Sequence, residues 1–275
     1  MFENLLTFAN QIRIGMETIT LSFDPNSEFA AALEEKEGKL HTCANVRKLS
    51  KVLAAILLMM TVALVSGRLN AQTYKGHEYV DLALPSGTLW ATCNVGADTP
   101  EGYGYYFAWG ETTTKTTYDW NTYKYGTGRA LTKYCHKSNY GKNGLTDNLT
   151  VLQSKDDAAT ANWGIGWCMP TKEQWSELIE NTSGQETTQN GVEGVLFTAK
   201  NGRSLFLPET GSQWRGMTQS DCGYWSSTLQ SDYPSCAWGF RIRVEIDYFD
   251  AFTYWEVGDL GRGSGLPVRA VRSSH

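Results

Sequence analysis

Cysteine and histidine are the residues of this chain that could act as nucleophile and general base, and they are few. The part after residue 71 contains five cysteines and three histidines, namely Cys93, Cys135, Cys168, Cys222, Cys236, His77, His136 and His275. Nucleophilic catalysis requires a Ser or Cys within hydrogen-bond reach of a base. The histidines lie near the start of that part, in a polar segment and at the last residue, so we expect them on the solvated surface. The sequence therefore predicts no catalytic residue.

Metal and phosphate chemistry also lacks the residue spacing that it needs. The chain has no Cys-x-x-Cys pair and no Cys/His cluster with zinc-ligand spacing, and it has no glycine-rich phosphate-binding loop. Asp156 and Asp157 are neighbouring carboxylates, but adjacent residues do not face each other on a helix. We interpret them as a helix cap and a first-turn acid, and we predict neither a metal site nor a cofactor.

The odd number of cysteines leaves the redox state open. Five thiols cannot all pair within one chain, so at least one stays free or pairs between chains. We expect Cys93–Cys135 and Cys222–Cys236 as the first disulfide pairings to test, with Cys168 left over. The alternative is that all five are reduced.

Aromatic side chains give the one indication of ligand binding. Trp90, Trp163, Trp175 and Trp225 lie inside strand or helix patterns, which predicts that they pack in the core. Other aromatic residues lie in segments that we interpret as loops, where Trp and Tyr rings can stack on a sugar or a peptide. The candidate ligand-binding residues are Trp214, Arg215, Asp247, Tyr248, Tyr254 and Trp255. Ordinary packing is the alternative for each of them.

Composition and charge exclude two classes of protein. The chain has 275 residues, with 24 Lys+Arg against 29 Asp+Glu and a formal net charge of −5. It has no Lys/Arg cluster that could form the basic face that nucleic-acid phosphates require. A hydrophobic content of 41% is too high for a disordered chain. All 10 Trp and all 14 Tyr lie at or after Tyr74, so the composition changes abruptly near residue 71.

A secretory signal accounts for this change. Arg47, Lys48 and Lys51 precede the apolar run Val52–Val65, and Ala71 is a small residue suited to cleavage. The run is shorter than the roughly 20 residues of a membrane-spanning helix. We predict a non-native or disordered extension over residues 1–45, a signal peptide over 46–71 and one secreted domain over 72–275 that does not span a membrane. An uncleaved anchor and a buried core helix are the alternatives.

Helix signals are strongest in the middle of the secreted part. Residues 156–163 predict a short helix with acids in its first turn. Thr171 and Gln174 have the spacing of a capping box, and Trp175 begins the buried stripe of a helix over about 172–181. We assign Thr171, Gln174, Trp175 and Trp225 structural roles.

Strand signals surround these helices. Tyr79–Leu84 and Thr88–Cys93 flank a Pro-Ser-Gly turn and predict a hairpin. Val195–Ala199 and Ser204–Pro208 flank Asn201-Gly202, which suits a type I′ turn. We expect further strands over 224–228, 237–243 and 266–272. This order predicts the α+β class, with helices segregated from an antiparallel sheet and long ordered loops between them.

The stretch Trp163–Trp175, which reads Trp-Gly-Ile-Gly-Trp-Cys-Met-Pro-Thr-Lys-Glu-Gln-Trp, resembles the Fibrobacter succinogenes major paralogous domain, a family of secreted bacterial modules. Stretches 80–96, 106–112, 156–163, 224–228 and 267–272 add to the resemblance, which covers about residues 74–272. It implies a C-type lectin-like fold, shared with formylglycine-generating enzymes, whose first and last strands pair. Cys168 departs from the family pattern, which has Arg at that place.

The resemblance implies little about chemistry, because one fold serves many functions. Cys222 and Cys236 are not spaced like the cysteine pair of formylglycine-generating enzymes. The calcium motifs of sugar-binding C-type lectins are missing, so calcium stays an open alternative that no motif supports. We expect a non-enzymatic module, secreted or held in the bacterial cell envelope (periplasm or outer surface), that binds a glycan or a protein there. A structural or adhesion component without a small ligand and a formylglycine-generating-like enzyme are the alternatives.

Overall fold

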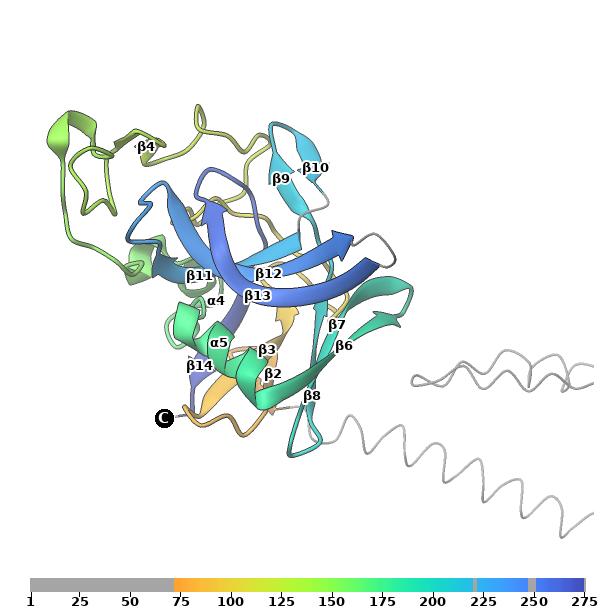
Figure 1. Cartoon of the computed structure of the whole chain (residues 1–275). Coiled ribbons are helices and arrows are strands. Elements are labelled where there is room, and N and C mark those ends of the chain that lie inside the picture. The colour runs from red at the N-terminus through yellow and green to blue at the C-terminus, as the bar shows by residue number, and fades with distance from the viewer. Residues whose placement is uncertain (1–71, 220–221, 247–250, 275) are drawn as a thin grey trace, which may run out of the picture. The chain divides into compact units, whose positions relative to one another are not determined.

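Residues 72–219, 222–246 and 251–274 are described by the computed structural model, and they form an α+β structure rich in antiparallel sheet (Figure 1). The predicted class is therefore confirmed. None of the helices in these ranges is long and apolar enough to cross a membrane. The extension over 1–45 and the signal peptide over 46–71 lie outside the described residues, so both stay predictions.

The first sheet contains both ends of the described chain. Its order is β1 (Gln72–Tyr74), β2 (His77–Asp81), β3 (Thr88–Asn94) and β14 (Arg269–Ser273). The predicted hairpin is present as β2–β3, in which Tyr79 pairs with Ala91. The last strand pairs with β3, where Val271 lies opposite Trp90. The expectation that it pairs with the first strand is wrong, because β1 and β2 form a meander with β3 and β14 adds to the other side of β3.

Two helices follow the first long loop region. They are α4 (Ala158–Trp163) and α5 (Lys172–Asn181), and the bounds of α5 are those predicted. The Gln174 amide donates to Thr171 Oγ1 at 3.2 Å, and the Thr171 amide donates to Gln174 Oε1 at 2.9 Å. The predicted capping box is thus complete. Trp175 and Leu178 are fully buried and attach α5 to the core.

The second sheet is the meander β6 (Thr182–Gln189), β7 (Val192–Ala199) and β8 (Ser204–Pro208). The predicted β7–β8 hairpin is present, but its turn is not type I′. That turn needs positive φ at both central residues, and of Asn201 and Gly202 only Gly202 has it. The Ala199 carbonyl instead accepts from the Gly202 amide, so the turn begins one residue earlier. The pair with two positive φ angles is Asn190–Gly191, at 48° and 83°, between β6 and β7.

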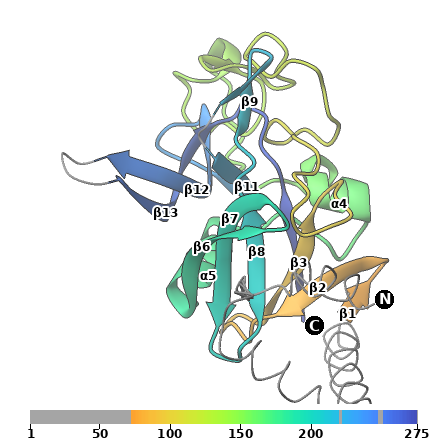
Figure 2. The same ribbon diagram turned by 90° about the vertical axis from the view of Figure 1, so that its right-hand side faces the viewer.

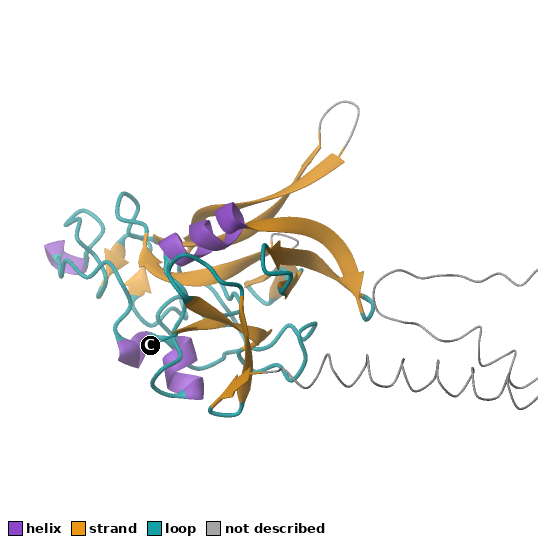
Figure 3. Cartoon of the chain, turned by 90° about the horizontal axis from the view of Figure 1, so that it is seen from below, coloured by secondary structure: helices purple, strands orange, loops and turns teal. Residues whose placement is uncertain are grey.

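The third sheet has the order β11 (Cys222–Leu229), β12 (Cys236–Ile246) and β13 (Ala251–Gly261). The view from below shows α5 beside the long β12–β13 hairpin (Figure 3), and the Trp175 ring stacks on Phe240 of β12 with centroids 5.0 Å apart. Tyr254 and Trp255 lie in β13 and not in a loop as expected. The run Phe-Thr-Tyr-Trp-Glu-Val is rich in strand-forming residues, which explains the difference.

Small hairpins and long loops complete the described chain. The hairpins are β4 (Gly126–Thr127) with β5 (Ala130–Leu131) and β9 (Ser212–Trp214) with β10 (Met217–Gln219). The 3₁₀ turns are η1 (Lys142–Gly144) and η2 (Ser154–Asp156). Figure 2 shows β9 among the loops at the end of the molecule away from β1.

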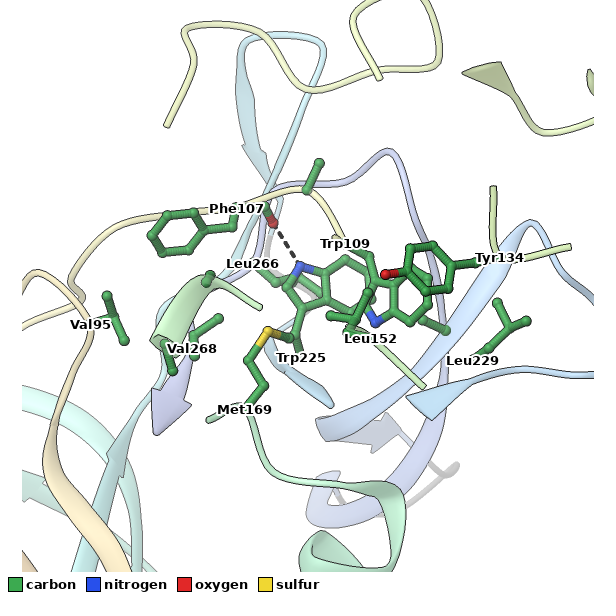
Figure 4. Packing of buried hydrophobic residues seen from close by; sticks show 14 of the residues in the cluster. Val95, Phe107, Trp109, Tyr134, Leu152, Met169, Trp225, Leu229, Leu266 and Val268 are labelled. Carbon is green, nitrogen blue, oxygen red and sulfur yellow. Dashed lines mark hydrogen bonds between the residues drawn. The ribbon is translucent and has the colours of Figure 1, made fainter. Parts of the chain in front are cut away.

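Tryptophan side chains connect the packed segments. The Trp225 indole donates to the Phe107 carbonyl at 2.7 Å (Figure 4). The Trp109 indole donates to the Ser226 carbonyl at 2.8 Å. The Trp175 indole donates to the Trp225 carbonyl at 3.3 Å. These three indole N–H groups thus have backbone partners, which avoids the cost of an unsatisfied donor, whereas the indole N–H of the equally buried Trp90 has none among the described residues. The structural roles predicted for Trp175 and Trp225 are confirmed.

The expected disulfides are absent. Cys93, Cys135, Cys168 and Cys236 are free thiols, so the pairing of Cys93 with Cys135 is wrong. Cys222 lies opposite Ile242 in the β11–β12 ladder, six residues along β12 from Cys236. Six strand residues span about 20 Å, whereas a disulfide needs Cα atoms within about 7 Å. The pairing of Cys222 with Cys236 is wrong for that reason.

Candidate functional site

A buried arginine organises the loops at the β9 end of the molecule. Arg262 is fully buried, and its guanidinium donates to the Tyr123 hydroxyl at 2.8 Å and to the carbonyls of Tyr134, Pro234 and Lys133 at 3.0, 2.9 and 3.1 Å. It also lies 4.8 Å from the centre of the Trp109 ring. One side chain after β13 therefore joins two regions that are far apart in the sequence, residues 123–134 and the segment of Pro234.

A buried carboxylate fixes the same loops from the other side. Asp156 is 3% exposed, and it accepts hydrogen bonds from the hydroxyls of Tyr125 and Tyr134 at 2.5 and 2.7 Å. It also forms an ion pair with Lys133. Burial opposes ionisation, but these hydrogen bonds and the Lys133 charge outweigh it and hold the pKa of Asp156 far below its ordinary value. The prediction of a first-turn acid is wrong for Asp156, whereas Asp157 does cap α4.

These loops surround a shallow cavity of about 550 Å³, which we call the aromatic depression. It is lined by one indole, one phenol, two hydroxyls, one guanidinium and a glycine, from Trp120, Tyr140, Thr127, Ser235, Arg129 and Gly128. Trp120 and Tyr140 are half-buried, and Arg129 and Thr127 are exposed. A volume of this size is within the range of small-ligand sites.

Glycine lets the walls of the depression pack closely. A Cβ on Gly128 would lie 3.3 Å from the Trp120 ring, and a Cβ on Gly263 would lie 3.4 Å from the rings of both Trp120 and Trp214. The Trp120 indole also meets Tyr123 edge-on, with centroids 5.5 Å apart. Trp120 therefore packs against Tyr123 and close to Gly128 and Gly263, while part of its surface remains in the depression.

The predicted residues Trp214 and Arg215 lie beside the depression, at the β9–β10 turn. Trp214 is half-buried against Gly263, and Arg215 is exposed, with its guanidinium 5.8 Å from the Trp214 ring centre. The Thr122 amide lowers the pKa of Asp119, next to Trp120 in sequence, and the charge of Arg215 acts in the same direction. Arg215 is thus close to the wall that Trp120 forms.

The structure does not place the other predicted aromatic residues, Tyr254 and Trp255, beside the aromatic depression. Trp255 packs between Phe197, with centroids 5.6 Å apart, and Gly184, where a Cβ would lie 2.3 Å from the indole. Trp214 and Trp255 therefore belong to different surfaces. Asp247 and Tyr248 lie outside the described residues, so their predicted role is untested.

Trp255 instead lines a second cavity, of about 350 Å³, which we call the α5 groove. One wall is the helical stripe Lys172, Ser176, Ile179 and Glu180. The other is formed by Trp238, Trp255, Glu256 and Val257 of β12 and β13. The Lys172 ammonium lies 4.0 Å from the centre of the Trp238 ring, which is cation–π distance.

The described thiols are not arranged as nucleophiles. Burial raises the pKa of Cys168 to about 11, and it also raises the pKa values of Cys93, Cys135 and Cys236. The thiolate is the reactive form, so at neutral pH these groups are protonated. The His77 ring stacks on Trp163 at 3.8 Å and not against a thiol. His77 is half-buried, which corrects the expectation of a solvated side chain.

Comparison with known proteins finds no matching protein-family model, curated protein or solved structure. Over the described ranges, no group of three or more His, Cys, Asp or Glu side chains is placed to hold a metal ion.

The sequence prediction named none of the six residues that line the aromatic depression. Trp120, Arg129 and Tyr140 come from the loop region, and Ser235 precedes β12, so no local spacing unites them. The one available signal was the density of Trp and Tyr in residues 118–140, a polar stretch that no regular strand or helix pattern explains.

Proposed function

We propose that this chain is an exported, non-enzymatic glycan-binding module that resembles the Fibrobacter succinogenes major paralogous domain and has a C-type lectin-like fold. The observation that carries the proposal is the aromatic depression. A sugar ring presents one apolar C–H face and a rim of hydroxyls. A rigid aromatic wall beside a few polar groups complements both.

Each group in the depression has a role in this proposal. The rings of Trp120 and Tyr140 provide the apolar contact. Arg129 provides several N–H donors in a planar fork, and the Thr127 and Ser235 hydroxyls can both donate and accept. Because the Trp120 ring is half-buried and already packs against Tyr123 and the backbone near Gly128 and Gly263, less side-chain freedom would be lost on binding, which favours affinity. The protonated thiols support the non-enzymatic part of the proposal.

Binding of the purified protein to an array of neutral and acidic glycans tests this function. The bound glycan is then titrated against Tyr140→Ala and Arg129→Ala, which should each weaken binding about tenfold or more, as loss of about 1.4 kcal/mol implies. Tyr103→Ala is the matched control, since Tyr103 is 45% exposed and does not line the depression. Failure to bind any glycan, or unchanged affinity in Tyr140→Ala, would contradict glycan binding at the aromatic depression. The alternative would then be a structural or adhesion component without a small ligand.

A further inference from the structure

The α5 groove lies between α5 and the β12–β13 hairpin, and β13 is an edge strand of its sheet. Three consecutive residues, Trp255, Glu256 and Val257, line it. Side chains alternate between the faces of a strand, and the Glu256 carboxylate pairs with Arg243 at 3.3 Å in the register that puts both on the face away from α5. Glu256 therefore lines the groove with its backbone, because its side chain lies on the other face of the strand.

The free edge of β13 lacks two of the features that protect an edge strand, proline and lysine, although it carries the charged residues Glu256 and Asp259. In the described chain β13 has β12 as its only strand partner, and Figure 2 shows β13 and α5 on the same side of the described residues. Its eleven residues, AFTYWEVGDLG, include neither proline nor lysine. Long edges without such residues are templates for pairing with another chain.

The helix beside this edge carries a charge pattern that is complementary to itself. Lys172, Ser176 and Glu180 are four residues apart and share one face of α5, and none of them has an ion-pair partner among the described residues. Lys172 lies at the Trp238 end of the groove. Glu180 lies at the Trp255 end, because Trp255 contacts Gly184, just past the end of α5. A rotation of the stripe by 180° about Ser176 places the positive Lys172 at the position of the negative Glu180, and the reverse.

The part of β13 beside the charged stripe has about the same length as the stripe and the same midpoint. Lys172 and Glu180 are about 12 Å apart along the helix axis. Trp238 pairs with Asp259, and Asp259 is about 13 Å from Trp255 along β13. The midpoint of that span is Val257, which lines the groove together with Ser176. A single two-fold axis near Val257 and Ser176 would therefore pair the edge of β13 with its copy and the charged stripe with its copy.

We propose that β13 is a dimer interface: two copies pair edge to edge and antiparallel around Val257, and Lys172 of each copy faces the partner's Glu180. The two β11–β12–β13 sheets then form one continuous sheet, with both α5 helices on the same face. Such an interface is isologous, so each contact occurs twice. This surface is separate from the aromatic depression, and the proposal does not depend on glycan binding.

The test is the mass of the purified full chain by sedimentation velocity over about 1 to 100 µM, because a dimer dissociates on dilution. Lys172→Glu and Glu180→Lys should each raise the dissociation constant about tenfold or more, since each places like charges together twice. The double variant Lys172→Glu/Glu180→Lys restores the pairing and should return the dissociation constant to near that of the wild type. Glu173→Lys, an exposed change outside the stripe, is the control.

Lys172 could also stabilise the monomer through its contact with Trp238. The double variant Lys172→Glu/Glu180→Lys keeps the test of dimerisation valid in that case. The double variant lacks that cation–π contact but regains the intermolecular pairs, so dimerisation separates from folding. Thermal unfolding of each variant shows that it is folded. A wild-type chain that stays monomeric throughout the range would overturn the proposal, as would a double variant that dimerises no better than the single ones.

Discussion

Two buried charged side chains, Arg262 and Asp156, explain how loops with little regular structure hold a fixed shape. Arg262 is satisfied by carbonyls and a phenol, and Asp156 by two phenols and Lys133. A buried charge is costly unless it is paired and hydrogen-bonded, so each of these groups stabilises only the arrangement that satisfies it. The loops around the aromatic depression are thereby specified by long-range hydrogen bonds.

Asp156→Asn tests this role. Removing one partner of a buried ion pair leaves Lys133 uncompensated and typically costs about 3 to 5 kcal/mol. We therefore expect the free energy of unfolding at pH 7 to fall by roughly 3 kcal/mol, measured by urea denaturation. The control is Asp232→Asn, because the Lys137–Asp232 pair has an 83% exposed carboxylate and should contribute less than about 1 kcal/mol.

The pH dependence of this effect has a definite sign. The pKa of folded Asp156 is lowered, so its contribution is complete above the unfolded value of about 3.9. It is lost as the pH falls below that value toward the folded pKa. The difference in unfolding free energy between the wild type and Asp156→Asn should thus shrink between about pH 5 and pH 2. A difference that stays constant over that range would show that the carboxylate charge is not what stabilises the loops.

At the element scale, α5 depends on its first turn. Thr171→Ala removes the side-chain acceptor of the Gln174 amide while leaving the helix sequence unchanged. We expect a loss of about 1 kcal/mol in the free energy of unfolding, as for other N-cap replacements. Thr113→Ala, an exposed loop change, is the control. Equal stability of the two variants would mean that the capping box does not contribute.

The elements that the sequence predicts well are those whose signals are local. The capping box of Thr171 and Gln174 and the stripe that begins at Trp175 lie within one turn of each other, and α5 has the predicted bounds. β6 was missed because its residues, TSGQETTQ, are polar and weakly alternating. The Asn190-Gly191 pair that follows it is a type I′ signal equal to Asn201-Gly202, and only the hydrogen bonding of the flanking strands decides which pair adopts that turn.

The candidate site was less predictable than the fold because its residues meet through long-range contacts. Trp214 and Arg215 were predicted from their residue types, and the structure places them beside the depression. Trp120, Tyr140 and Ser235 are brought together by the bonds of Arg262 and the packing of Gly263, which no local pattern encodes. Trp255 was predicted as part of the same site, but strand pairing places it with α5.

At the scale of the whole molecule, the two surfaces would act together. A dimer formed through β13 carries two aromatic depressions, and two linked sites bind a repeating polymer more strongly than either does alone. A variant that stays monomeric, Lys172→Glu, should therefore bind a short oligosaccharide as the wild type does but bind a polysaccharide more weakly. Titration with both ligands measures this difference, and equal loss for the two would place Lys172 in the glycan site itself.

The stability of the described chain as a whole rests on packing without disulfides. Cys93, Cys135, Cys168 and Cys236 are free, and the sheets are held by two clusters of buried side chains around Trp109 and Trp175. Loss of a native disulfide costs about 2 to 5 kcal/mol, and 1 kcal/mol shifts the melting temperature by roughly 2 to 4 °C in a domain of this size. We expect a reducing agent to leave the melting temperature of the purified protein unchanged, and at least four thiols to react with a thiol reagent in denaturant without prior reduction. A fall of several degrees on reduction, or fewer reactive thiols, would mean that a disulfide joins residues that the structure keeps apart.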